Sequence, residues 1–162
     1  MCIRDRSKLE SEKLLLDQSE DSLVIRSNVL YDYSSKSRAS FLNWVVDSLN
    51  QEKEISVVED QWNNPTWTGS LAVVIDRAID TQVTGLVHWG DGDLVSRFDF
   101  ANKIADAFNL KKSLIKPILT SELNQTAKRP LKSGLTSDYA QNILNLEPPT
   151  IKECLETIVE QK

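Results

Sequence analysis

The 162-residue sequence is poor in the residues that build disulfide frameworks, metal sites and membrane spans. Its two cysteines, Cys2 and Cys154, form no spaced pair, so a zinc site is improbable and a reducing, cytoplasmic location is expected. No stretch approaches the ~18 uninterrupted apolar residues of a membrane-spanning helix, and the N-terminus lacks a signal-peptide core. With 19 Lys and Arg against 24 Asp and Glu, the net charge of -5 argues against a nucleic-acid partner.

The sequence also lacks an evident catalytic or phosphate-binding motif. In Gly90-Asp91-Gly92 the third glycine of a dinucleotide fingerprint would fall at Val95, so this segment is interpreted as a turn. The single histidine, His88, lies in an apolar run without an evident Ser or Cys nucleophile and is interpreted as structural. The adjacent carboxylates of Glu59 and Asp60 are interpreted as solvated.

What the sequence does contain is an alternation of short apolar runs with amphipathic stretches, which is typical of an α/β fold. The run at 23–25 is expected to be buried on both faces, and Pro117 indicates that the last strand is an edge strand. Phe98, Ala101, Ile104, Ala105 and Phe108 are expected to form a buried helical stripe. The predicted strands cover 23–25, 55–58, 85–89 and 114–119, and the predicted helices cover 7–16, 41–49, 71–79, 98–108 and the segment after 150.

Three segments have the pattern of a capping box, in which a side chain at the helix start and one three residues later satisfy free amides. They are Ser7-Lys8-Leu9-Glu10, Ser96-Arg97-Phe98-Asp99 and Thr150-Ile151-Lys152-Glu153. Each predicts that a helix begins directly after its first residue.

Two features have both a ligand-binding and a structural interpretation. Trp62 and Trp67 bracket a proline-containing loop, where they can stack on a ligand ring or pack within the loop. Arg129, in Lys128-Arg129-Pro130, lies in an irregular segment. Its guanidinium can bind a phosphate bidentately or remain a solvated surface charge.

Four segments, in order, carry a resemblance to a known family. They are Ser7-Lys8-Leu9-Glu10-Ser11-Glu12, Val24-Ile25-Arg26-Ser27-Asn28-Val29-Leu30-Tyr31, Val57-Val58-Glu59-Asp60-Gln61 followed by Pro65-Thr66, and Lys128-Arg129-Pro130. From about Ser7 to its end, the chain resembles the C-terminal half of extended short-chain dehydrogenase/reductases. The similar branch is dTDP-4-dehydrorhamnose reductase-like and reduces nucleotide-bound 4-keto sugars.

The resemblance implies the C-terminal part of a Rossmann-like fold with its substrate lobe. Residues 1–6 are then a start foreign to the family, and 7–162 hold the catalytic-helix remnant, the last sheet strands and the substrate-binding lobe as one domain. Lys8 matches the catalytic lysine of the Tyr-x-x-x-Lys motif, and Arg129 would contact the substrate diphosphate. The resemblance implies no metal, and the intact protein of which this chain would be a part could form a homodimer. The residues expected at the nucleotide-sugar substrate are Asn28, Tyr31, Gln61, Pro65, Thr66 and Arg129.

The departures from the family pattern are equally specific. Arg4 stands where the tyrosine is expected, four residues before Lys8, and the Gly-rich turn of the cofactor site is missing. The parent would use NADP(H) or NAD(H), whereas we expect this chain alone to be an inactive fragment that binds no nucleotide cofactor. Val29 and Asp32 replace residues common in relatives and weaken an assignment to the rhamnose precursor.

Two alternatives remain open. One is a non-catalytic regulatory or binding subunit, because the same branch includes a regulatory partner of methionine adenosyltransferase. The other is a fragment of an NAD-dependent sugar epimerase or dehydratase.

Overall fold

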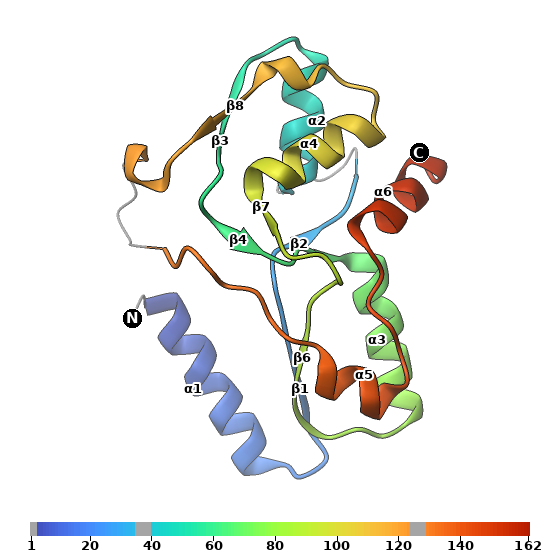
Figure 1. Cartoon of the computed structure of the whole chain (residues 1–162). Coiled ribbons are helices and arrows are strands. Elements are labelled where there is room, and N and C mark those ends of the chain that lie inside the picture. Colours follow the sequence, from blue (N-terminus) through green and yellow to red (C-terminus); the bar gives the residue numbers. More distant parts are fainter. Residues whose placement is uncertain (1–2, 35–39, 124–128) are drawn as a thin grey trace.

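The computed structural model describes residues 3–34, 40–123 and 129–162 (Figure 1). Cys2 and Lys128, both named in the sequence analysis, lie outside the described residues. The helices are α1 (Ile3–Gln18), α2 (Phe41–Asn50), α3 (Thr68–Asp80), α4 (Arg97–Ala107), α5 (Asp138–Leu144) and α6 (Ile151–Glu160). The strands are β1 (Leu23–Ser27), β2 (Leu30–Tyr31), β3 (Ile55–Val58), β4 (Trp62–Asn63), β5 (Thr66–Trp67), β6 (Gly85–Trp89), β7 (Val95–Ser96) and β8 (Ile115–Ile118).

The strands pair in twos, and three of these pairs are parallel. β1 pairs with β6, β3 with β8 and β2 with β5, whereas β4 and β7 are antiparallel. Parallel pairs need crossover connections, and helices supply them here. The predicted α/β class is confirmed, and so are the strands at 55–58 and 85–89.

Two apolar clusters form the core. One joins α2, α4 and α6 to β3 and β8, and it includes Val45, Ile104 and Ile158. The other packs α3 and α5 against β6 through residues such as Val74 and Trp89. Figure 1 shows the first group of elements at one end of the molecule, and the β1–β6 pair at the other end between α1 and α3. None of the described helices combines the length and apolarity needed to cross a bilayer.

The predicted start of the first helix is wrong. The helix begins at Ile3, and Ser7 lies inside it, where its carbonyl oxygen accepts a hydrogen bond of 2.8 Å from Ser11 Oγ. Good helix formers and an exposed ion pair of 2.9 Å between Arg6 and Glu10 extend α1 toward the N-terminus. The predicted helix starts after Ser96 and Thr150 are confirmed, because Ser96 Oγ and Thr150 Oγ1 each accept from the amide three residues later. The box is reciprocal at Thr150, whose amide donates to the Glu153 carboxylate, whereas the Asp99 carboxylate accepts from the Ser96 hydroxyl.

Three further expectations differ from the structure. Strand β1 is half-buried rather than buried on both faces. In α4 it is Phe100 that joins Ala101, Ile104 and Ala105 in the core, whereas Phe98 and Phe108 are only partly buried. Helix α5 was not anticipated, because it is seven residues long and buries only Ala140 and Leu144. So short an element leaves little periodic signal.

Candidate functional site

A cavity of about 270 Å³ lies where α2, β3 and the start of α4 meet. Its volume is close to the lower end of those of small-molecule sites. Helix α2 provides an aromatic wall through Phe41 and Trp44, whose ring centroids are 5.6 Å apart, and β3 provides the floor. The lining residues are Phe41, Trp44, Ser56, Val57, Val58, Gln61, Arg97, Leu123 and Arg129.

Gln61 holds two walls of this cavity together. Its side chain is 5% exposed and donates from Nε2 to Thr120 Oγ1 at 3.0 Å. Its backbone carbonyl accepts from the amide of Arg97 at 3.1 Å. Asp60 assists, since its Oδ1 accepts from the amide and the hydroxyl of Thr120 at 3.0 and 2.6 Å. The interpretation of Asp60 as merely solvated is therefore wrong, whereas Glu59 is exposed.

Two guanidinium groups line the cavity. Arg129 is exposed, and Arg97, the first residue of α4, is partly buried with its Cζ 5.8 Å from the centroid of the Phe41 ring. Burial and, secondarily, the positive charge of Arg129 lower the pKa of Arg97. No acidic side chain is among the described residues that line the cavity. The arrangement favours an anionic ligand, because two positive charges that line one cavity repel each other unless an anion lies between them.

Arg97 is the site residue that the sequence interpretation missed. Arg97 lies within a segment whose pattern is explained by a helix start, so the pattern gives no separate indication of a site. It is also distant from Arg129 in the sequence. Gln61 and Arg129 are the two predicted site residues that the structure brings together in this cavity.

Asn28 lies at the end of β1 and does not line the cavity. Its Nδ2 donates to Asn64 Oδ1 at 3.0 Å and to the carbonyl oxygen of Ser133 at 2.7 Å. Asn64 in turn donates to the carbonyl oxygens of Asp91 and Leu135 at 3.2 and 3.0 Å. The two asparagines therefore connect β1 to the segment that follows Arg129.

The remaining residues expected at the substrate are buried outside this cavity. Tyr31 is 1% exposed and its ring packs edge-on against Phe100 at 4.9 Å, because the strand β2 directs it into the core. Thr66 pairs with Leu30 between β5 and β2, and Pro65 is buried beside it. The structure thus buries these three residues, and they are not among the residues that line the cavity.

The two loop tryptophans also lie away from the cavity lining. Trp67 packs against the core, and its amide donates to Asp91 Oδ2 at 2.7 Å. Trp62 is 38% exposed and lies in β4, and its backbone amide donates a hydrogen bond to the Leu131 carbonyl oxygen. For Trp67 the structure agrees with loop packing.

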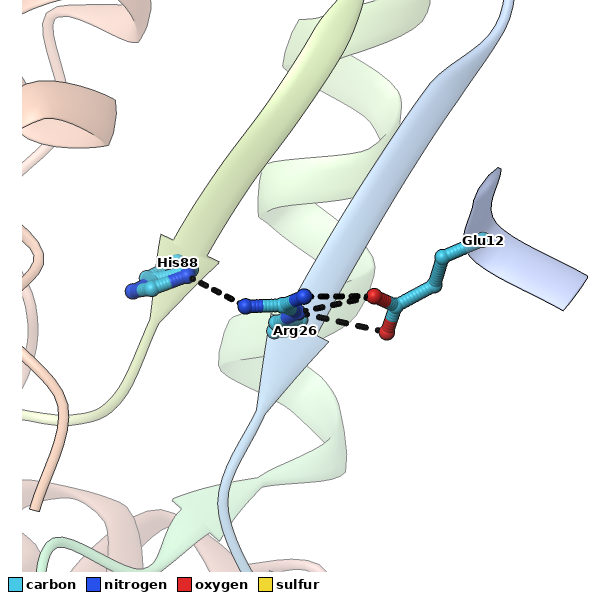
Figure 2. Close-up of polar contacts among 3 residues, drawn as sticks. All are labelled: Glu12, Arg26 and His88. Carbon is cyan, nitrogen blue, oxygen red and sulfur yellow. Dashed lines mark hydrogen bonds and ion pairs between the residues drawn. The ribbon is translucent and has the colours of Figure 1, made fainter. Parts of the chain in front are cut away.

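Lys8 is exposed on α1, one turn before Glu12, and does not line the cavity. Glu12 forms an ion pair of 2.6 Å with Arg26 Nη2, and Arg26 Nη1 lies 3.5 Å from His88 Nε2 (Figure 2). His88 is therefore part of a contact between helix and sheet, as its structural interpretation predicts. The described residues include no group of three or more His, Cys, Asp or Glu side chains placed to hold a metal ion.

A second cavity of about 930 Å³ lies between β1 and α3. Most of its lining is aliphatic or uncharged, and Asp21 is the charged residue there. Its lining residues, as far as the structure describes them, include no cation, so it is a poorer candidate for an anionic substrate.

The comparisons with known proteins show the family of the chain. Residues 1–162 match the family model described as the RmlD substrate binding domain. The dTDP-4-dehydrorhamnose reductase of Aggregatibacter actinomycetemcomitans is 26% identical over 170 residues, which span 98% of this chain and 56% of that protein. The methionine adenosyltransferase 2 subunit beta of Bos taurus is 31% identical over 137 residues, which span 80% of this chain and 40% of that protein.

The solved structures agree with these matches. The dTDP-4-dehydrorhamnose reductase of Bacillus anthracis, in complex with NADP, superposes with a TM-score of 0.87 at 28% identity. The match covers 97% of this chain and 54% of that one. The chain thus spans about half the length of the reductases that it matches.

Proposed function

The chain belongs to the family of the RmlD substrate binding domain, as its sequence resemblance predicts, and on that premise we propose that it supplies the substrate-binding part of an NAD(P)H-dependent nucleotide-sugar reductase. The substrate would be a dTDP-linked 4-keto sugar. The single observation that carries the proposal is the cavity that Gln61 and Arg129 share with an aromatic wall, and whose described lining residues include no carboxylate.

Arg129 has the chemistry that a diphosphate requires. A guanidinium offers two parallel N–H donors to phosphate oxygens, and such charge-assisted hydrogen bonds are worth about 1.5–3 kcal/mol each. In this proposal Arg129 neutralises the diphosphate, and Gln61 orients the wall beside the sugar. Holding the substrate in one orientation lowers the barrier of the reaction by itself.

Lys8 is the residue of this chain that fits the cofactor. Its exposed ammonium on α1 would hydrogen-bond the nicotinamide ribose, where NAD(P)H would supply the hydride. Arg4 holds the place of the family's proton-donating tyrosine, and a guanidinium keeps its proton near neutral pH. We therefore assign substrate binding, and no proton transfer, to this chain.

Calorimetric titration with dTDP tests the proposal. We expect Arg129→Gln to weaken dTDP binding about ten-fold or more, because it removes a charge-assisted contact. Arg77→Gln, an exposed arginine on α3, is the matched control and should leave the affinity unchanged. If the unaltered chain does not bind dTDP, or if Arg129→Gln binds as tightly, the proposal is wrong.

A non-catalytic binding subunit is the second candidate. The 31% identity to methionine adenosyltransferase 2 subunit beta and the presence of Arg4 in place of tyrosine favour it. Size-exclusion chromatography with a methionine adenosyltransferase catalytic subunit distinguishes the two. Stable co-elution without dTDP binding would support this second candidate over the reductase part.

A further inference from the structure

The side chain of Arg97 lines the cavity. Its Nε is buried and makes no hydrogen bond to any residue that the structure describes. No ion pair with an acidic side chain is formed by Arg97 in the described part of the chain. A partly buried cation in this state is unusual, because burying a charge is unfavourable unless an opposite charge or hydrogen bonds compensate it.

The guanidinium of Arg129 adds to this uncompensated charge, because it is also positive and lines the same cavity. Two cations that line one cavity, with no acidic side chain among its described lining residues, form a site for a ligand with at least two negative charges. A diphosphate has this property, whereas a neutral sugar or an aromatic ring does not.

The position of Arg97 is well defined by its surroundings. Its backbone amide donates to the Gln61 carbonyl at 3.1 Å, and Ser96 caps the helix that begins at Arg97. Its guanidinium lies over the Phe41 ring at 5.8 Å. A guanidinium held in this way loses little freedom on binding, so that its contact contributes more fully to affinity.

We propose that Arg97 and Arg129 bind the same diphosphate, and that Arg97 makes this cavity select nucleoside diphosphates over monophosphates. The inference rests on the proposed function and adds to it a residue that determines specificity. Arg129 would contact one phosphate and Arg97 the other, so removing Arg97 should affect the second phosphate above all. The aromatic wall at Trp44 and Phe41 lies beside them and is available to a base or sugar ring.

The test compares dTDP with dTMP by calorimetry, on the chain and on its Arg97→Gln and Arg97→Lys variants. For Arg97→Gln we expect dTDP binding to weaken about ten-fold or more, and dTMP binding to change less than about three-fold. The ratio of the two affinities should therefore fall. Arg97→Lys keeps the positive charge but lacks the two parallel N–H donors of a guanidinium. Its ratio of dTDP affinity to dTMP affinity should therefore be intermediate.

Two further measurements separate this role from a structural one. Thermal unfolding of each variant shows whether the fold is intact, and Arg77→Gln should bind both nucleotides like the unaltered chain. The Arg97→Gln, Arg129→Gln double variant should lose less than the sum of the two single losses, because both residues contact one ligand.

The outcomes for the two proposals are distinct. If the unaltered chain binds dTDP and Arg97→Gln leaves the dTDP-to-dTMP ratio unchanged, the assignment of Arg97 is wrong while the proposed function stands. If dTDP does not bind at all, inorganic pyrophosphate becomes the probe. Pyrophosphate binding that Arg97→Gln abolishes supports the two-arginine site, and its absence in the unaltered chain overturns it.

Discussion

Arg26 on β1 donates from Nε to both carboxylate oxygens of Glu12 on α1, at 3.2 and 3.1 Å, and from Nη2 at 2.6 Å (Figure 2). The two side chains are 38% and 20% exposed, so water screens the pair only in part. Most of α1 is exposed, which makes this ion pair a main attachment of the helix to the β1–β6 pair. It lies one turn beyond Lys8, and thus its geometry also determines where Lys8 is presented.

Glu12→Gln should destabilise the chain by about 1 kcal/mol at pH 7, a value discounted for the exposure of the pair. The hydrogen bonds from Arg26 lower the pKa of Glu12 below its usual 4.5. Its stabilising contribution is therefore present above pH 4.5 and is lost as the pH falls through the lower pKa of the folded state. Urea denaturation at pH 7 and pH 3 should show the difference between the two proteins shrinking at pH 3. An equal difference at both pH values would contradict the ion pair.

Gly90→Ala should destabilise the fold by about 2–3 kcal/mol, through overpacking. A Cβ at Gly90 would lie 2.1 Å from Asn64 Nδ2 and would push aside the side chain that connects β1, Asp91 and Leu135. Gly92→Ala in the same turn is the control, because its Cβ would meet the Pro148 carbonyl oxygen at 3.3 Å. The thermal unfolding midpoint of Gly90→Ala should be clearly lower than that of Gly92→Ala. Equal midpoints would argue against a close approach of Asn64 to Gly90.

Thr150→Ala should cost about 1 kcal/mol, the usual value of an N-cap. Thr150 Oγ1 accepts from the Glu153 amide at 3.3 Å, and the Glu153 carboxylate accepts from the Thr150 amide at 2.7 Å. Thr157→Ala, on the same helix, removes an exposed hydroxyl that bonds only its own helix, and should cost much less. Urea denaturation of both variants measures the difference, and comparable losses would refute the capping assignment.

Cys154 should react very slowly with iodoacetamide in the folded chain at pH 8. It is 1% exposed, and burial raises the pKa of its thiol to about 12, so that almost no thiolate is present. A Cys2→Ser background removes the other thiol. Mass spectrometry should detect rapid alkylation only after urea is added. Reaction of the folded protein at the rate of a free thiol would show that Cys154 is accessible.

Local interactions can be predicted from the sequence of this protein alone. The strand Gly85–Trp89 is a mostly apolar run, and the helix Ile151–Glu160 follows a capping box and contains an apolar stripe. Such patterns act between residues close in the chain, so they can be recognised without the fold. The predicted start of α1 is wrong, because a helix whose side chains are mostly exposed has no apolar periodicity to mark its boundary.

The composition of the site depends on how distant segments pack together. The sequence predicts Arg129 as a candidate site residue, because a guanidinium can bind phosphate. Arg97 is the first residue after a helix cap, and nothing in its local sequence indicates a site. Only the packing of α2, β3 and α4 brings the two arginines into one cavity. In the same way, nothing in the local pattern distinguishes Tyr31, which is 1% exposed, from a residue that lines a ligand. Burial and the meeting of like charges depend on contacts between distant segments, and those contacts exist only once the chain has folded.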